Sequence, residues 1–262
     1  MKIYDLSQVL DQDCSFWPFY PPFEVKYFKR KSEHGVNAQY IQSSNHMGTH
    51  LDAPRHFVTN GKTIDQLPLD WLYGDGVIVD LSDSLDELGI FYPEDIEAKA
   101  EIKNGDILFI HTGWHKYSFH APDGDEEKYI QRHPGPHHSI VEWLLDKKIH
   151  LWGVDMISTD HPMNLPIGRF LGKGGLEHWQ KVRNQVIAQV GGEDKLDELF
   201  PDEAYQLTHN ALFPHDCIHV ENLGGEIGNP LLHNKRLTLG CFPWKFGGGE
   251  AAFCRAVAFV ED

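Results

Sequence analysis

Residues 46–56 carry three histidines and one aspartate within eleven positions, and their spacing restricts the backbone that can hold them. A helix would place His46 and His50 one turn apart on the same face. Gly48 is a poor helix former and Pro54 disfavours a helix just before it, so an extended chain is the better interpretation. Side chains two positions apart share one side of a strand. The residues that would share it are His46, His50, Asp52 and His56.

A straight strand would not bring these side chains to one ion. At a rise of about 3.3 Å per residue, the first two histidines would stand about 13 Å apart. Gly48 is placed to bend the chain between them, and Thr49 is expected to tie the bend through its hydroxyl. Pro54 then sets the exit direction and carries His56 around the far side. We therefore predict a bent strand that gathers metal ligands, in preference to a histidine-rich surface loop without chemistry.

The charge balance of the chain excludes several classes of partner. The 262 residues include 23 Lys and Arg against 39 Asp and Glu, a formal net charge of −16. Such a chain is not expected to bind nucleic acid or an anionic membrane. It has no apolar run of membrane-spanning length and no signal-peptide pattern, so a cytoplasmic location is expected. The four cysteines lack C-x-x-C spacing and are expected to be reduced thiols in or near the core.

Strand and helix patterns alternate along the chain. Segments rich in β-branched and aromatic residues are predicted strands at 2–6, 23–30, 38–44, 76–81, 106–113, 150–156, 217–223, 236–242 and 253–261. Helices are predicted at 93–101, 137–148, 176–190 and 202–207. Segment 158–175 holds two prolines and four glycines and is predicted to be a long functional loop. The mixture predicts a single α/β domain with a β-rich core over residues 1–262.

The stretch "HMGTHLDAPRHF" at 46–57 resembles the H-x-G-T-H-x-D-x-P-x-H-F signature of the cyclase family of metal-dependent hydrolases, with every fixed position present. The resemblance extends to "MKIYDLSQ", "LFIHTGW", "GVDMISTDH" and "RAVAFVED", and so covers most of the chain. That family includes bacterial kynurenine formamidases, isatin hydrolases and a lactamase. The resemblance implies an α/β fold of the swivelling β/β/α type and a metal-dependent hydrolase.

The resemblance also implies individual roles. The ligands of the first ion would be His46, His50 and Asp52. His56 would be the catalytic base. The formamidase branch holds a second ion by a histidine and a glutamate twelve residues apart, a separation that His209 and Glu221 match, with Asp52 bridging both ions. These donors suit Zn²⁺ or Mn²⁺ without discriminating between them. A His–Glu hydrogen bond beside a single ion is the alternative.

The N-terminal segment departs from the formamidase pattern. That branch reads like W-P-G-D-P-P-F, whereas this chain has "FWPFYPPF" at 16–23. This segment and the longer chain fit the isatin-hydrolase-like branch better than a specific assignment to N-formylkynurenine. Trp17 and Phe19 are predicted to form an apolar wall for a flat substrate, and an ordinary aromatic core is the alternative. Ser158 and Asp160 are predicted to hydrogen-bond substrate or a histidine that lies behind the metal ligands, and a capped strand-end turn is the alternative.

The predicted activity is metal-dependent hydrolysis of a small linear or cyclic amide of arylformamide, isatin or lactam type, with a metal-activated water and His56 as base. The alternatives are a lactonase or a cyclase/dehydratase at the same site, or a non-catalytic protein that binds a metal or small ligand. An intact His56 disfavours the binding protein, because a binder needs only the ligands. A serine route is not expected, since the chain has no G-x-S-x-G motif. The resemblance further implies a homodimer or homotetramer.

Overall fold

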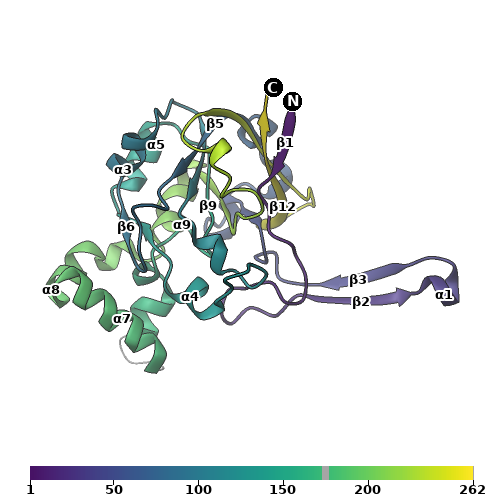
Figure 1. Ribbon diagram of the computed structural model, residues 1–262, viewed down its shortest axis with the longest axis horizontal. Helices are drawn as coiled ribbons and strands as arrows, with labels where there is room; N and C mark the ends of the chain where they lie inside the picture. Colours follow the sequence, from purple (N-terminus) through teal and green to yellow (C-terminus); the bar gives the residue numbers. More distant parts are fainter. Residues whose placement is uncertain (173–176, 262) are drawn as a thin grey trace.

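The computed structural model describes residues 1–172 and 177–261. A β-rich body lies at its centre, a hairpin projects from one side, and helices α7 (Glu177–Val190) and α8 (Glu193–Leu199) lie on the other (Figure 1). The main sheet has the strand order β1-β12-β11-β5-β7-β9-β10-β4. Its strands are β1 Lys2–Asp5, β4 His50–Asp52, β5 Tyr73–Asp80, β7 Ile107–His111, β9 Leu151–Val154, β10 Ile218–Glu221, β11 Arg236–Pro243 and β12 Ala251–Val260.

The long strand β12 closes this sheet into a barrel-like ring. One end of β12 pairs with β1 and the other end pairs with β4, which is also bonded to β10. Strands β5, β7, β9 and β10 run parallel to one another, and the remaining pairs are antiparallel. The mixed α/β fold with a β-rich core is the predicted one.

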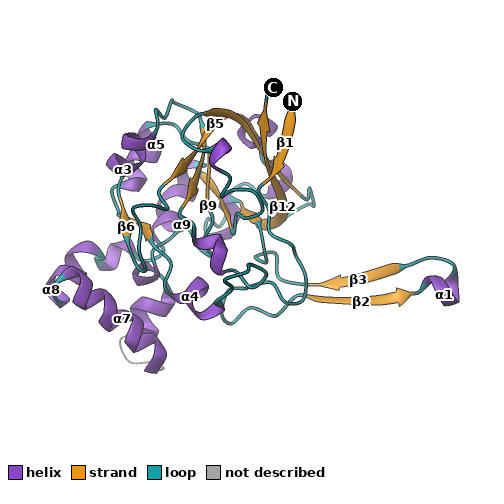
Figure 2. Ribbon diagram, viewed as in Figure 1, coloured by secondary structure: helices purple, strands orange, loops and turns teal. Residues whose placement is uncertain are grey.

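Both faces of the central strands are covered. Ile78 and Phe109 point into the interior of the ring, whereas their neighbours Val79 and Ile110 pack outward against helices. The covering helices include α3 Pro93–Lys99, α5 Ile140–Asp146 and α9 Leu207–Leu212. Figure 2 shows these helices around the strands of the body. Because both faces are buried, stretches such as 107–110 are apolar without alternation.

Smaller elements surround the ring. The projecting hairpin consists of β2 Glu24–Lys29, α1 Lys31–His34 and β3 Ala38–Gln42. The remaining strands and α-helices are α2 Leu69–Leu72, β6 Ile90–Phe91, α4 Glu126–Gln131, β8 Gly135–Pro136, α7 Glu177–Val190 and α8 Glu193–Leu199. Among the described residues, no helix has the length and apolar character needed to cross a membrane. All four cysteines are free thiols, as predicted.

Each of the nine predicted strands is present, and so are the helices predicted at 93–101 and 137–148. The helix predicted at 176–190 is α7, although Leu176 lies outside the described residues. Segment 158–175 is not one long loop: it contains a 3₁₀ turn at Pro162–Asn164 and a π-helical turn at Ile167–Leu171, and residues 173–175 lie outside the described part. The helix predicted at 202–207 is only a 3₁₀ turn, Asp202–Ala204. Strand β4 lies within the bent extended segment predicted at 46–56, whereas sequence patterns missed β6, β8, α1, α2, α4, α8 and α9.

Candidate metal centre

The chain bends at Gly48, as predicted. Gly48 has a φ of +54°, a left-handed conformation that favours glycine, and β4 begins two residues later. The hydroxyl of Thr49 does not form its hydrogen bonds within the bend. It donates to the carbonyl of Asn222 at 2.5 Å and accepts from the N–H of Gln8 at 2.8 Å. Thr49 therefore fastens the bent segment to two other parts of the chain, which local sequence could not reveal.

Strands β4 and β10 place four polar side chains directly opposite one another. In their antiparallel register, Asp52 faces His219 and His50 faces Glu221. The intervening Leu51 and Val220 point into the interior of the ring, so the polar side chains share the opposite face. His219 was missed in the sequence. The sequence signal for His219 was its position two residues before Glu221, within the predicted strand at 217–223.

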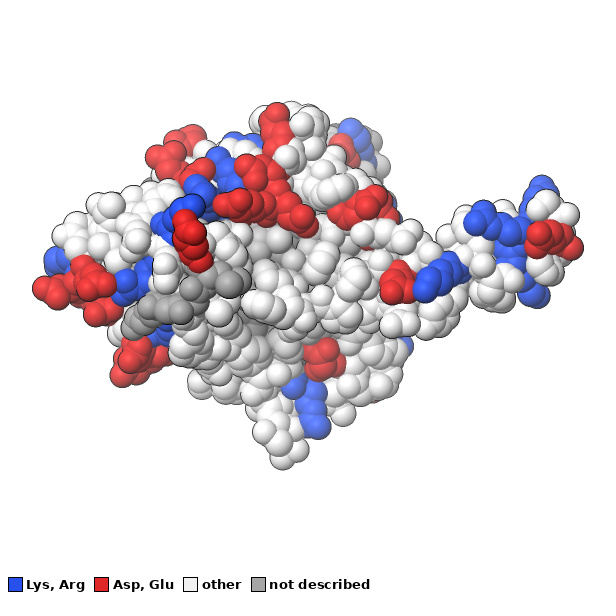
Figure 3. Space-filling model, turned by 90° about the horizontal axis from the view of Figure 1, so that it is seen from below, with Lys and Arg blue, Asp and Glu red and all other residues white. Residues whose placement is uncertain are grey.

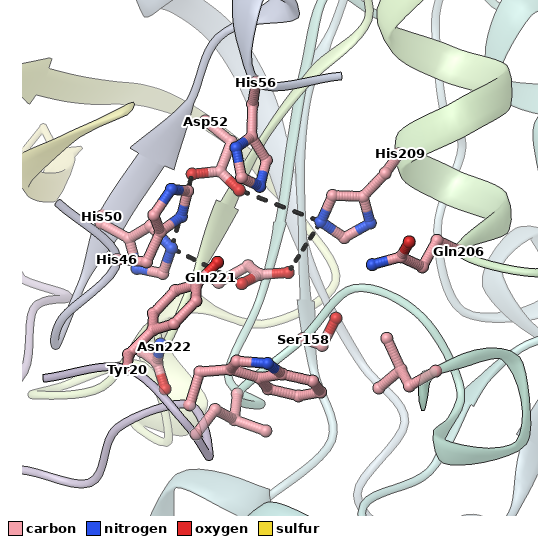
Figure 4. A pocket seen from close by; sticks show the side chains of 13 residues that line it. Tyr20, His46, His50, Asp52, His56, Ser158, Gln206, His209, Glu221 and Asn222 are labelled. Carbon is pink, nitrogen blue, oxygen red and sulfur yellow. Dashed lines mark ion pairs between the residues drawn. The ribbon is translucent and has the colours of Figure 1, made fainter. Parts of the chain in front are cut away.

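Helix α9 brings His209 to the same face. Nε2 of His209 lies 3.9 Å from Oδ2 of Asp52 and 3.8 Å from Oε1 of Glu221 (Figure 4). Nδ1 lies 2.8 Å from Oδ2 of Asp160, whose other oxygen accepts the N–H of Thr208. Asp160 thus contacts a histidine, but the histidine is a candidate ligand and not one behind the ligands, and the contact orients its ring.

His46 and His56 approach from the bent segment and its 3₁₀ turn η1, Pro54–His56. Nδ1 of His46 lies 3.0 Å from Oδ1 of Asp52. Glu250 joins the two histidines, with Oε2 at 2.9 Å from Nε2 of His46 and 2.8 Å from Nδ1 of His56. Glu250 was not among the site residues predicted from the sequence. It reaches the site because it immediately precedes β12, which pairs with β4.

Several buried polar atoms at this centre lack hydrogen-bond partners: Nε2 of His50, Nε2 of His219 and both carboxylate oxygens of Asp52. Nδ1 of His46 lies 3.0 Å from Oδ1 of Asp52 and Nε2 of His219 lies 3.4 Å from Oδ2, but neither contact has hydrogen-bond alignment. Unsatisfied buried groups are costly and rare, so their convergence calls for a ligand. Two sets hold their donor atoms within 4.8 Å of one another and share Asp52: Asp52, His209, His219 and Glu221, and His46, Asp52 and His56. Imidazoles with carboxylates fit a divalent metal ion.

The electrostatics of the centre favour a cation. Burial lowers the pKa of His50 and of His219 to about 4, so both rings are neutral near pH 7 and offer lone pairs. Burial, aided by the charge of Asp52, raises the pKa of Glu221 to about 7. Burial opposes a charge on His46, but Asp52 and Glu250 outweigh it and raise the pKa of His46 to about 10. The carboxylates of Asp52 and Glu221 thus share a buried space in which positive charge is scarce. A divalent ion would supply that charge.

A cavity opens beside these residues (Figure 4). Trp17 and Ser158, both predicted to contact substrate, line it. Phe19 does not: its side chain is 75% exposed, and its φ of +76° turns it away from the cavity. Tyr20 takes that place instead, with its ring 5.6 Å from that of His46. The remaining lining residues are His46, His50, Asp52, His56, Ile157, Leu165, Gln206, His209, Glu221 and Asn222.

Residues 4–161 match the family model described as Putative cyclase. The chain belongs to the cyclase family. It is 33% identical over 157 residues to the kynurenine formamidase of Bacillus thuringiensis subsp. konkukian (strain 97-27), a match that covers 60% of this chain and 69% of that protein. The family resemblance inferred from the signature is therefore confirmed.

Solved structures support the fold of this cyclase-family member. Isatin hydrolase A from Ralstonia solanacearum superposes with a TM-score of 0.76 at 18% identity, over 99% of this chain and 92% of that one. Isatin hydrolase A from Labrenzia aggregata, bound to benzyl benzoate, gives 0.75 at 19% identity, over 100% and 94%. At these identities the likeness concerns the fold, and it extends across nearly the whole chain, including the part beyond residue 161.

Proposed function

We propose that this chain is a metal-dependent amidohydrolase that cleaves a small linear or cyclic amide of arylformamide, isatin or lactam type. The observation that carries the proposal is the group of unpartnered donor atoms around Asp52, which opens into a cavity with aromatic walls. The similarity to a kynurenine formamidase and the shared fold with isatin hydrolases support an amide bond as the target.

The proposed ligands of one or two ions, Zn²⁺ or Mn²⁺, are His46, His50, Asp52, His209, His219 and Glu221. Such an ion, when bound, supplies a water of lowered pKa and polarises the amide carbonyl. Asp52 is the residue best placed to be shared, since it belongs to both sets of converging donors. The neutral rings of His50 and His219 need no deprotonation before they bind.

His56 is the proposed proton carrier. Its Nδ1 is held 2.8 Å from Glu250, which leaves Nε2 as the nitrogen that can exchange a proton in the cavity. It would take a proton from the attacking water and deliver it to the leaving nitrogen. The carboxylate of Glu250 orients the ring.

The walls of the cavity favour a flat substrate. Trp17 and Tyr20 provide aromatic faces, and Gln206, Ser158 and Asn222 provide polar contacts. Burial, aided by the charges of Asp52 and Glu221, raises the pKa of Tyr20 to about 12. Its hydroxyl therefore stays protonated near neutral pH and can donate a hydrogen bond to a substrate oxygen.

A substrate panel tests the proposal. Formanilide, isatin, an aryl lactam and its matched lactone are each assayed with purified chain, after chelation, and after return of Mn²⁺ or Zn²⁺. We expect turnover of at least one amide, loss after chelation and recovery with metal. Faster turnover of the lactone than of every amide would favour the lactonase alternative. Metal binding without any turnover would favour a binding protein.

We also propose that the chain forms a homodimer through the projecting hairpin, residues 24–42. An isolated two-stranded hairpin is only marginally stable in water. This one exposes Tyr27, Phe28, Val36, Tyr40 and Ile41. It contains four Lys and Arg against two Glu, in a chain of net charge −16, and the basic side chains gather towards its tip (Figure 3). A basic, partly apolar arm suits the acidic surface of a second copy.

Light scattering tests the dimer. The wild-type chain should give a mass near twice 30.0 kDa at micromolar concentration. Phe28→Asp combined with Ile41→Asp should give the monomer mass, because both changes bury charge in the proposed contact. Leu69→Asp, at an exposed apolar position far from the hairpin in sequence, is the control and should leave the mass unchanged. A monomeric wild-type chain contradicts the proposal.

A further inference from the structure

A second group of potential metal ligands lies where β7 and β9 end. His111 closes β7, His115 lies in the following 3₁₀ turn η3, Trp114–Tyr117, and Asp155 follows β9. Each offers a ligand atom, and these atoms lie within 4.8 Å of one another. We call these three residues the strand-end cluster. None of them lines the cavity of the metal centre around Asp52.

His111 presents an unpartnered nitrogen to this cluster. Its side chain is buried, with 5% of the residue exposed, and Nδ1 lies 2.9 Å from Oδ1 of Asp80. The other oxygen of Asp80 lies 3.1 Å from Nδ1 of His233, so the carboxylate is held on both sides. Nε2 of His111 is buried and has no hydrogen-bond partner. A carboxylate on one ring nitrogen and a free lone pair on the other is how proteins orient a histidine towards a metal.

Asp155 supplies an anionic oxygen between the two imidazoles. Its Oδ1 accepts hydrogen bonds from the N–H of Thr112 at 2.8 Å and from the hydroxyl of Thr112 at 2.6 Å. Its Oδ2 lies 3.0 Å from Nδ1 of His115 and 3.9 Å from Nε2 of His111. Burial would raise the pKa of Asp155, but His115, His111 and Thr112 outweigh it and hold that pKa well below its usual range.

The space beside the two rings is kept free of side chains. A Cβ atom on Gly228 would lie 3.2 Å from Nε2 of His115 and 3.6 Å from Nε2 of His111. His115 also lines a cavity of about 340 Å³, together with Gly224 and Gly225, and its side chain is 22% exposed, so solvent reaches the cluster at His115. An ion would have both a space and a route of access.

A hydrogen-bond network alone accounts for only part of this arrangement. It explains the contacts of Asp80 with His111 and of Asp155 with His115. It leaves Nε2 of His111 buried and unsatisfied, which is costly for a polar group.

We propose that His111, His115 and Asp155 form a second metal site that takes Zn²⁺ or a similar divalent ion. Two imidazoles and a carboxylate leave one tetrahedral position for water. The ion would join η3 to the ends of β7 and β9. The segment after β9 continues to Ser158 in the other cavity, so the ion stabilises one wall of that cavity. This site does not depend on which reaction the chain catalyses.

Metal content tests the site. Wild type, His115→Gln and His120→Gln are dialysed against buffered Zn²⁺, and zinc per chain is measured by mass spectrometry. His120 lines the same cavity but pairs with Asp11 at 2.7 Å, outside the strand-end cluster, and serves as control. We expect His115→Gln to bind one ion fewer than wild type and His120→Gln to bind the same number. Turnover of His115→Gln should stay within about two-fold, because His115 lies outside the catalytic cavity.

A crystallographic measurement locates the ion and guards against a misfolded variant. Anomalous difference maps at the zinc edge should show a peak within bonding distance of Nε2 of His111 in wild type. Gly228→Ala keeps every ligand but fills the space beside them, and it should lose the same ion. Equal zinc content in wild type and His115→Gln, with no anomalous peak beside His111, overturns the proposal.

Discussion

Nδ1 of His209 lies 2.8 Å from Oδ2 of Asp160, and this contact turns the opposite ring nitrogen towards Asp52 and Glu221. Asp160 follows β9, His209 lies on α9 and Glu221 ends β10. The contact therefore fixes α9 to the segment that follows β9, beside the end of β10. The position of His209, a candidate ligand, therefore depends on Asp160, whose carboxylate does not itself face the converging donors.

The first prediction concerns that carboxylate. Asp160→Asn should lower metal affinity by about 10–100-fold, the usual effect of losing the partner of a ligand histidine. Competition with a chromophoric chelator measures it. Asp202→Asn, at an exposed carboxylate that pairs with Arg169, is the control and should bind as wild type does. Unchanged affinity in Asp160→Asn would show that His209 is positioned without it.

The second prediction concerns His56. His56→Ala should reduce kcat/KM by about 10²–10⁴-fold, the usual contribution of general acid–base catalysis, while the metal content stays at the wild-type value. His215→Ala, at an exposed histidine, should change neither quantity. Loss of an ion from His56→Ala would instead make His56 a ligand, a role that its place beside His46 and Asp52 permits.

The third prediction decides how many ions the main centre holds. Glu221 is buried opposite His50 and lies between His209 and His50. Glu221→Gln keeps its shape but removes its charge, so the metal content should fall by one ion per chain. Glu226→Gln, in the exposed turn that follows, should leave the count unchanged. Equal ion counts with lost activity would give Glu221 a role in substrate contact instead.

The fourth prediction concerns acid stability. Burial lowers the pKa of His133 to about 4, from an ordinary value of 6.5. Between these values the unfolded chain binds a proton that the folded chain does not, so stability is present above pH 6.5 and is lost as the pH falls towards 4. The slope is about 1.4 kcal/mol per pH unit for one such group.

His133→Leu should flatten the pH dependence of the unfolding free energy by up to that slope. Urea denaturation between pH 7 and pH 4.5, with chelator present throughout, measures it without a contribution from metal release. Parallel profiles for the two proteins would show that His133 is not a source of the acid sensitivity.

Local sequence determined much of the fold and part of the site. Strand segments such as 106–113 were readable because β-branched and apolar side chains accumulate where both faces of a sheet are buried. The bend at Gly48 was readable because a left-handed turn between ligand-type residues favours glycine. The signature at 46–57 and the twelve-residue separation of His209 and Glu221 pointed to the metal centre through family resemblance.

Tertiary structure alone decided the remaining members of the site. Strand β4 has only three residues within the extended segment predicted at 46–56, and the partners that hold it in place, β10 and β12, could not be read from the sequence. That pairing sets His219 opposite Asp52 and brings Glu250 to His46 and His56. Phe19 and Tyr20 could not be told apart in the sequence, because only the backbone turn at Phe19 determines which ring faces the cavity. Register and strand closure depend on contacts between residues far apart in the chain, and no local pattern records them.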